Sequence, residues 1–335
     1  TGVQTCALPI FDGLKTSEYL LETAKEHIEG RIDIKTAQKR IQTYYEERQT
    51  RTEIEEGTKE ADIVSARIAE LLGERTFQFS PAEWKTIHKR LFKDIFPHAG
   101  EYRTYNITKS EWVLNGETVL YASADSIRDT LDYDFGQEKQ FSYEGLSAGD
   151  AVKAYCEVYF RYMADSPFCE GNTRTTAVFI IKYLKTFGFS VNNEIFAENS
   201  WYFRNALVRA NYNDLGKGII ANTIYLERFF ENLLMGNQNE LKNRFIHVNY
   251  KEQSAIQSAK SAIEKDPKCN NCTLEELAIL KELLKNPSIT QKELAGIIGK
   301  SERTIKTRTV EMQEKGLIRR ENGKRNGRWE VQVKL

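Results

Sequence analysis

Hydrophobic residues recur every three to four positions along much of the first 235 residues, which is the spacing of helices with one buried face. In residues 33–56 they fall at Ile34, Ala37 and Ile41, with Asp33 as the expected N-cap and Gly57 as the residue that ends the helix. The same spacing predicts helices over about 60–72, 81–96, 151–163, 201–211 and 219–234, and a buried helix that ends at Phe187. The pattern therefore predicts a mainly α fold.

Two short stretches, residues 102–107 and 112–121, alternate between apolar and polar residues instead. Such alternation is typical of a strand with one buried face. Asn115-Gly116, inside the second stretch, is a dipeptide favoured in tight hairpin turns. We therefore expect a β-hairpin here, which is the only strong strand signal before the C-terminus.

The loop Ser166-Pro-Phe-Cys-Glu-Gly-Asn-Thr-Arg174 separates two of the predicted helices. Gly171 permits close approach of the backbone, and free N–H groups at the start of the next helix attract anions. Glu170 supplies oxygen ligands suited to Mg²⁺, and Arg174 supplies a planar fork of donors for phosphate oxygens. The residues indicate a site for a metal-bound polyphosphate; on the residues alone, an ordinary polar interhelical loop is the alternative.

This loop resembles the signature of the Fic family, HxFx(D/E)GNxR in its relaxed form. The matching positions are Phe168, Glu170, Gly171, Asn172 and Arg174. The resemblance covers roughly residues 33–235 and implies a Fic-type helical core with a β-hairpin flap, residues 102–121, that docks the target polypeptide beside the loop. Members of this family usually transfer AMP from ATP to a hydroxyl of a protein and release pyrophosphate.

The resemblance also implies roles for individual residues. The residues assigned to the nucleotide are Phe168, Gly171, Asn172, Thr173, Arg174 and Asn211. Within this group, Asn172 and Arg174 would hold the phosphates, the amides of the turn would bind the α and β oxygens, and Phe168 would fix the loop by packing in the core. Glu170 would hold Mg²⁺, so Mg²⁺ and ATP are the implied cofactor and substrate. For Asn211, a solvated helix-end asparagine is the alternative.

One position departs from the family pattern, because Ser166 stands where the family has its catalytic histidine. That histidine takes the proton from the attacking hydroxyl, and serine cannot do so near neutral pH. Loss of a general base typically costs about 10²–10⁴-fold in rate, so we expect slow transfer with Ser166 as a hydrogen-bonding orienter. Asp165 is either a substitute base or, the simpler interpretation, a solvated carboxylate at a helix end. None of the four histidines lies in the loop, and nothing in the sequence brings one there.

Thr52, Glu56 and Gly57 resemble the family's inhibitory motif, (S/T)xxxE(G/N). Residues four apart share one helix face, and in the family the glutamate of this motif enters the nucleotide site and blocks productive placement of the γ-phosphate. Its usual partner is a second arginine, but position 177 is alanine here. We therefore expect Glu56 to be loosely held or to turn to Arg174, and autoinhibition to be weak. A solvated acidic helix end is the alternative.

The last sixty residues form a separate unit. Residues 274–285, 291–298 and 301–315 are predicted helices with short connections, and 317–321 and 328–333 are predicted strands of a wing. This pattern resembles a winged helix-turn-helix. From position 300 onward there are eleven basic and five acidic residues, which favours contacts to a duplex backbone. The expected DNA contacts are Arg303, Lys306, Arg308, Lys324 and Arg325; a protein-interaction or dimerisation module is the alternative.

The composition limits the class of protein but indicates no particular binding partner. The 48 basic and 48 acidic residues balance, and five irregularly spaced cysteines favour a reducing compartment over a disulfide framework. The longest apolar stretch, 177–181, is far shorter than the roughly 20 residues of a membrane span. We therefore expect a cytoplasmic protein that does not enter a membrane.

Residues 1–10 back-translate to a common sequencing adapter, and we interpret them as a cloning or assembly scar rather than a native apolar tail. The expected organisation is then an N-terminal helical region over 11–75 with an inhibitory helix at about 33–57. A Fic domain follows over 76–235, then a linker over 236–272 and a winged helix-turn-helix over 273–335.

Two functions fit this organisation. The first is a protein adenylyltransferase that modifies Ser, Thr or Tyr of a target protein; modification of the chain by itself and a homo-oligomer stay open. The second is a DNA-binding regulator whose Fic domain binds a nucleotide without useful turnover.

Overall fold

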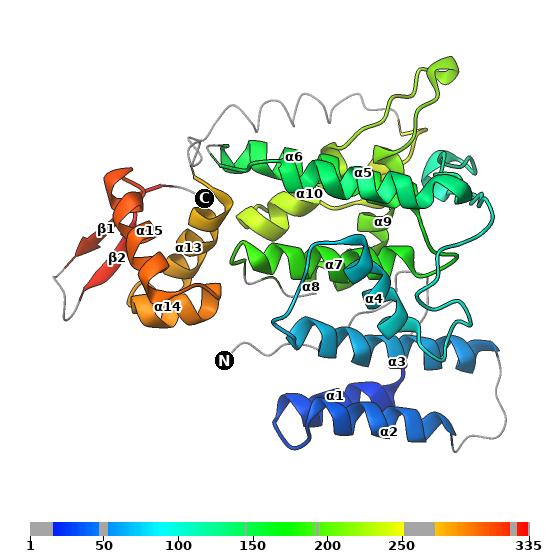
Figure 1. Ribbon diagram of the computed structural model, residues 1–335, viewed down its shortest axis with the longest axis horizontal. Coiled ribbons are helices and arrows are strands. Elements are labelled where there is room, and N and C mark those ends of the chain that lie inside the picture. Colours follow the sequence, from blue (N-terminus) through cyan, green and yellow to red (C-terminus); the bar gives the residue numbers. More distant parts are fainter. Residues whose placement is uncertain are drawn as a thin grey trace. The chain divides into compact units, whose positions relative to one another are not determined.

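The computed structural model of the chain (Figure 1) describes residues 16–46, 53–144, 146–189, 191, 194–250, 272–321 and 327–333, without the side chains of 46, 53–57, 148, 158–164, 194, 197 and 274. The fold is mainly helical, as predicted. It divides into two compact units: Thr1–Lys139, Phe160–Tyr183 and Asn192–Asn222 form the first, and Gln140–Tyr159, Leu184–Val191 and Thr223–Leu335 form the second. The domain boundaries expected from the sequence stay predictions.

The first unit is helical apart from the segment that follows α4. Its helices are α1 (Glu18–Ile28), α2 (Ile34–Glu46), α3 (Glu53–Gly73), α4 (Pro81–Phe92), α5 (Ile127–Gln140), α8 (Glu194–Glu198) and α9 (Ser200–Ala210). Two more, α6 (Ala148–Asp165) and α7 (Asn172–Thr186), contribute residues to both units. Helices α1, α2 and α3 lie side by side in Figure 1.

The N-terminal helices enclose a small core that also contains a carboxylate. Leu20, Ile41 and Ala66 pack together there. Asp62 of α3 is fully buried beside them and accepts hydrogen bonds from the Ser17 N–H at 2.8 Å and the Tyr45 hydroxyl at 2.6 Å. Because a buried carboxylate is stable only with such donors, Asp62 fixes the positions of the first three helices relative to one another.

The predicted helix over residues 33–57 is wrong at its C-terminal end, while residues 47–52 lie outside the described residues. Helix α2 ends at Glu46, and Gly57 lies inside α3, which begins at Glu53. Gly57 therefore does not end a helix. A glycine inside a helix costs about 1 kcal/mol relative to alanine, and the 21-residue α3 tolerates it because its later turns are buried. Thr52 lies outside the described residues.

The predicted flap is a turn-closed loop and not a paired β-hairpin. The Asn115-Gly116 turn is confirmed, with positive φ at both residues. Trp112–Leu114 form a 3₁₀ turn, and the N–H of Glu111 donates to the carbonyl of Glu117 at 2.9 Å. The alternation was misleading because Val113 and Leu114, adjacent in sequence, are both buried, which a strand with one buried face does not allow.

Helices α1, α5 and α8 were not predicted from the apolar spacing. In α5, Ile127, Leu131 and Phe135 are buried at a spacing of four residues, a signal that the polar residues between them and Gly136 obscured. Phe135 joins an aromatic cluster with Trp84 of α4 and Phe179 of α7, and this cluster lies beneath the signature loop.

The second unit contains α10 (Ile224–Phe230), a π-helical turn (Glu231–Met235), α11 (Asn243–Ile246) and the C-terminal elements. These elements are α13 (Leu274–Lys285), α14 (Gln291–Ile298), α15 (Glu302–Glu314), β1 (Ile318–Glu321) and β2 (Arg328–Val331). The strands pair antiparallel, with Ile318 opposite Val331. Thr290 and Ser301 cap α14 and α15 as predicted, and the three helices and the wing are confirmed.

Among the described residues, no helix combines the length and the apolar character needed to cross a membrane.

Candidate functional site

The signature loop, residues 166–174, lines a pocket of about 190 Å³ with two other segments. The loop contributes Ser166 and residues 169–173, the flap contributes Lys109, Glu111 and Tyr121, and α9 contributes Arg204 and Val208. The structure thus brings together the loop and the flap that the sequence separated by more than forty residues. The contribution of α9 was not predicted.

The loop has a fixed backbone shape. Gly171 has φ +73° and Ser166, unusually for a residue with a side chain, has φ +34°. The side chain of Asn172 binds across the loop, because its Oδ1 accepts from the Phe168 N–H at 2.9 Å and its Nδ2 donates to the Phe168 carbonyl at 2.7 Å. Both polar atoms of the Asn172 amide are therefore engaged in closing the loop.

His88 of α4 supports the loop from beneath, contrary to the expectation that no histidine approaches it. Its Nδ1 accepts from the Gly100 N–H at 2.8 Å, so Nε2 carries the proton and donates to the Glu170 carbonyl at 3.0 Å. The ring stacks on Phe168 at 3.8 Å. Burial lowers the pKa of His88 to about 4, so the ring is neutral at physiological pH. His88 does not line the pocket and holds the loop from below.

Gly171 is needed at its position for a second reason besides its positive φ. A Cβ on this residue would lie 2.3 Å from Cε2 and 2.5 Å from Cζ of Phe92. Phe92 is fully buried at the end of α4, so the ring has no space to move into. The loop backbone thus rests directly on the Phe92 ring.

Arg174 pairs with a glutamate that sequence analysis did not single out. Its Nη2 donates to Glu60 Oε1 at 2.6 Å, and its guanidinium lies over the Phe92 ring at 4.7 Å. Glu60 belongs to α3, one turn after Glu56. The residues that line the pocket do not include Arg174. The Glu56 side chain lies outside the described residues, so its expected contact with Arg174 stays a prediction.

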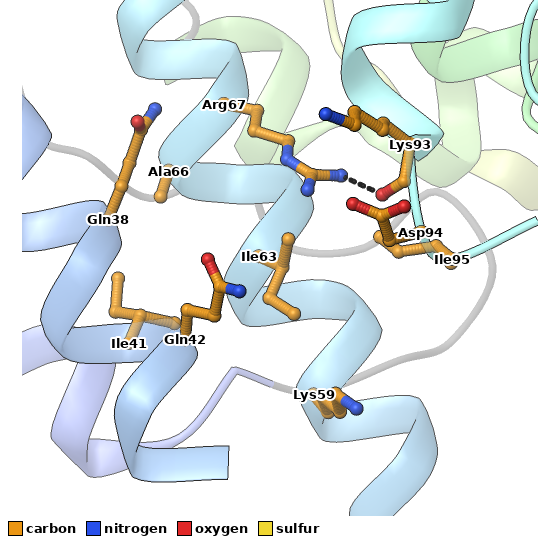
Figure 2. Close-up of a pocket in the computed structure, with 10 residues that line it drawn as sticks. All are labelled: Gln38, Ile41, Gln42, Lys59, Ile63, Ala66, Arg67, Lys93, Asp94 and Ile95. Carbon is orange, nitrogen blue, oxygen red and sulfur yellow. Dashed lines mark hydrogen bonds between the residues drawn. The ribbon is translucent and has the colours of Figure 1, made fainter. Parts of the chain in front are cut away.

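The C-terminal end of α4, which carries Phe92, is tied to α3 by a second arginine. Figure 2 shows Arg67 of α3 reaching across a pocket of about 250 Å³. Its Nη1 donates to the carbonyls of Leu91 at 2.9 Å and Lys93 at 2.7 Å. A cation at the last carbonyls of a helix stabilises that end, so Arg67 holds α3 against the helix end that carries Phe92.

Asp165 is not the solvated carboxylate that the sequence favoured. It is 2% exposed, and its Oδ2 has no hydrogen-bond partner among the described residues. Burial, together with a smaller contribution from nearby Asp134, raises the pKa of Asp165 to about 8 against the opposing effect of Arg103. Asp165 does not line the pocket. A protonated carboxyl beneath the loop is a poor general base.

Asp165→Asn is expected to be more stable relative to the wild-type protein at pH 8 than at pH 4, because the amide has no proton to lose inside the buried site. The folded carboxyl keeps its proton up to about pH 8, whereas the unfolded one loses it near 3.8. The contribution of Asp165 to stability is therefore full below pH 4 and is lost as pH rises toward 8. Thermal unfolding from pH 4 to 9 measures this, with the exposed Asp132→Asn as the control. Parallel pH profiles for the two variants would contradict it.

A buried ion pair joins the flap to α9 at the pocket wall. Glu111 is 1% exposed and accepts two hydrogen bonds from Arg204, at 2.7 and 3.0 Å. The Tyr121 hydroxyl donates to the same carboxylate at 3.3 Å. By contrast, the side chain of Glu170 is exposed where it lines the pocket. Of the two carboxylates in the pocket wall, only that of Glu170 is open to solvent.

Asn211 does not join this pocket. It lies at the C-terminal end of α9, and its Nδ2 donates to the Leu207 carbonyl at 2.9 Å. The side chains that α9 contributes to the pocket are instead those of Arg204, about two helical turns before Asn211, and of Val208. The expected contact of Asn211 with the nucleotide therefore stays a prediction.

The predicted DNA contacts differ in their surroundings. Arg303 and Lys306 are exposed on α15, and Lys306 pairs with Glu302 of the same helix. Arg308 instead turns inward, because it pairs with Glu275 of α13 and with Glu311. Lys324 and Arg325 lie outside the described residues. Arg303 and Lys306, together with the exposed Thr307 and Val310, thus form the outward face of α15.

The chain was compared with proteins of known structure and with curated protein sequences. Among solved structures, the chain is similar to the VirB-translocated effector protein BepC from Bartonella tribocorum, with bound AMPPNP, at 21% identity over 51% of this chain and 81% of that one, with a TM-score of 0.41. It is also similar to the N-terminal FIC domain of Bep8 from Bartonella sp. 1-1C, at 18% identity over 53% and 85%, with a TM-score of 0.40. No curated protein sequence matches the chain. Likeness this low assigns no ligand.

Two family models match the chain in separate places. Residues 78–184 match the Fic/DOC family, and residues 276–319 match a winged helix-turn-helix DNA-binding family. The first match contains the flap, the signature loop and α4, and the second contains α14, α15 and the start of the wing. The chain therefore carries a Fic/DOC-family domain, which holds the signature loop, followed by a winged helix-turn-helix domain.

Proposed function

We propose that this chain is a slow protein adenylyltransferase, which transfers AMP from ATP to a Ser, Thr or Tyr hydroxyl. The hydroxyl belongs to a target polypeptide docked at the flap or to the chain itself. The observation that carries the proposal is the pocket in which the signature loop, the flap and α9 meet at the first residue of α7. A helix N-terminus beside a glycine turn is suited to an anionic ligand.

The phosphates of ATP would contact the backbone more than the side chains of the loop. The amide of Asn172 is engaged with Phe168, so Asn172 would offer its own N–H group to the phosphates, as would Gly171 and Thr173. Arg174 would add its guanidinium only after leaving Glu60. Phe168, fully buried, would act by fixing the loop.

The pocket fits Mg²⁺ through Glu170. Protein sites for this ion use one or two carboxylates together with substrate phosphates and water, and Glu170 is the exposed carboxylate beside the phosphate-binding turn. When bound, Mg²⁺ neutralises part of the phosphate charge. Glu111 is less suited, because Arg204 already holds both of its oxygens.

The transfer would depend on positioning and not on a strong base. The target hydroxyl oxygen bonds to the α-phosphorus, the bond from that phosphorus to the bridging oxygen breaks, and pyrophosphate leaves. The hydroxyl proton passes to solvent, because the pocket residues described here include no histidine. Ser166 would orient the hydroxyl by hydrogen bonding. Phosphoryl-type transfers rely largely on positioning and electrostatics, so the rate would be low but measurable.

Incubation of the purified chain with ATP labelled at the α-phosphate and with Mg²⁺ tests the proposal. We expect ATP binding by calorimetry and slow label incorporation into the chain or into an added protein extract. Binding without label would leave the regulator hypothesis. Absence of ATP affinity in the presence of Mg²⁺ would refute both.

We further propose that Glu60 restrains the site by holding Arg174. The pair is mostly buried, with 7% of the Arg174 side chain and 21% of the Glu60 side chain exposed. A phosphate would compete with Glu60 for the same guanidinium. This contact would make α3 inhibitory, as the family resemblance implies, but through a residue one turn after Glu56.

Glu60→Gln is expected to raise ATP affinity on the order of 10-fold, because a hydrogen bond between charged groups contributes about 1.5–3 kcal/mol. Glu56→Gln, on the same helix, is the matched control and is expected to change the affinity less than 2-fold, a bound well below that contribution. Calorimetric titration of both variants with ATP and Mg²⁺ measures the difference. A larger effect at Glu56 would restore the original assignment of the brake.

A second function is favoured by one further observation, the exposed basic face of α15. Arg303 and Lys306 lie on it one turn apart, in the helix that enters the major groove in helix-turn-helix proteins. We propose that this domain binds duplex DNA.

Arg303→Ala combined with Lys306→Ala is expected to weaken DNA binding in a gel shift and to lower the salt dependence of binding by about two charges. Arg308→Ala, whose side chain is paired internally, should weaken binding less. Equal effects of the two changes would count against it.

A further inference from the structure

Arg103 is a buried cation at the start of the flap, and no sequence pattern singled it out. Its side chain is 2% exposed. Nε donates to the Ser166 carbonyl at 2.9 Å, and Nη2 donates to the Asp165 carbonyl at 3.2 Å. Nη1 donates to the Tyr105 carbonyl at 3.0 Å, and Nη2 also binds the Ala122 carbonyl. One guanidinium therefore joins both ends of the flap to the start of the signature loop.

The main chain of Arg103 adds to this connection. Its N–H donates to the Pro167 carbonyl at 2.8 Å, so Arg103 holds the carbonyls of three consecutive residues, 165–167. The middle one, Ser166, has a left-handed backbone at φ +34°, which costs a residue with a side chain roughly 1–2 kcal/mol. The bonds from Arg103 maintain that conformation at the residue that faces the pocket.

The chemistry of the contacts explains why this residue is arginine. The acceptors are neutral carbonyls that diverge in direction, and a planar guanidinium with five fixed donors can serve them together. A lysine carries the same charge but binds from a single point. Burying a cation against carbonyls instead of a carboxylate is costly, and a purely structural role could be filled more cheaply by apolar packing.

We propose that Arg103 is a positioning residue that couples the seating of a target polypeptide on the flap to the orientation of Ser166 in the pocket. The inference rests on the proposed transfer activity and adds a residue to it. Arg103 acts only through the backbone of the loop and the flap. The phosphate-binding turn at Gly171 is held separately, by His88 and Asn172. Loss of Arg103 should therefore slow AMP transfer and leave ATP binding nearly unchanged.

The test uses Arg103→Lys, made in the full chain and also combined with Ser166→His so that transfer is fast enough to follow. We expect the ATP dissociation constant to change less than 3-fold. We expect kcat for transfer to fall at least 10-fold, because a displacement of about 1 Å near a reacting group can cost 10²-fold. Hydrogen exchange of the flap and of residues 166–168 should become faster.

Arg67→Lys is the matched control, since Arg67, although only half-buried, also binds main-chain carbonyls in the same unit (Figure 2). It should lower the unfolding temperature without accelerating hydrogen exchange in the flap.

Unchanged kcat in Arg103→Lys, or a loss of ATP binding together with transfer, would overturn the inference. If Ser166→His shows no transfer, the proposed function is refuted, and this result does not bear on the role of Arg103. The exchange data then decide about Arg103, and unchanged exchange in the flap and in 166–168 would refute its role.

Discussion

Ser166→His is expected to raise the rate of AMP transfer about 10²–10⁴-fold at neutral pH, the usual contribution of a general base. In energy this is about 3–5.5 kcal/mol of barrier. Ser166 lines the pocket, and its backbone is already held by Arg103 and by the turn that Asn172 closes. A histidine there would supply the base that the proposed site lacks. The rate should rise with pH as the imidazole loses its proton.

Label incorporation from α-labelled ATP measures this prediction, with Ser166→Ala as the control. Alanine removes the hydroxyl without adding a base, so its rate should stay within about one order of magnitude of that of the serine form, well short of the gain from a base. ATP affinity should be similar in all three proteins, because the phosphates would contact the turn at 171–173. A histidine variant that gains nothing would show that a missing base does not limit the rate.

Gly171→Ala is expected to lower ATP affinity at least 100-fold and to destabilise the domain by about 3 kcal/mol. Overpacking costs typically 1–3 kcal/mol, and the left-handed backbone adds about 1 kcal/mol for a residue with a Cβ. The added carbon would lie 2.3 Å from Phe92 Cε2. Since His88 packs on Phe92 and holds the Glu170 carbonyl, the displacement would reach the phosphate-binding turn itself.

Gly30→Ala separates the cost of the left-handed backbone from the cost of the contact with Phe92. Gly30 has φ +74°, nearly the same as Gly171, but a Cβ there would meet no atom within 4 Å. Its expected cost is therefore only the backbone term of about 1 kcal/mol, with no change in ATP binding. Denaturant unfolding and calorimetry of both variants make the comparison. Equal losses of stability and an intact ATP affinity in Gly171→Ala would mean that Phe92 does not support the loop.

The contact between Glu60 of α3 and Arg174 shows why the inhibitory motif does not by itself decide which glutamate meets the arginine. The motif at Thr52 and Glu56 indicated a helix that faces the nucleotide site, and α3 does supply a glutamate to Arg174. Because α3 begins at Glu53 and continues through Gly57, its turns are set by its burial against α2 and α4. Which turn meets Arg174 depends on that packing.

Local patterns in the sequence determined the helical class, the position of the signature loop and the winged helix-turn-helix. Each depends on residues close together in the chain: apolar spacing, a glycine turn before a helix, and N-caps such as Thr290 and Ser301. The Asn115-Gly116 turn was likewise local and correct, whereas the strands around it needed a pairing that the buried neighbours Val113 and Leu114 prevent.

Only the tertiary structure decided which distant groups support that loop. His88, Arg103 and Glu60 come from separate segments, and each reaches the loop through contacts that span more than sixty residues. The burial of Asp165, and with it the raised pKa, has the same origin. Sequence spacing reports the periodicity of one element, while the charge state and the hydrogen-bond partners of a side chain depend on the elements that pack around it.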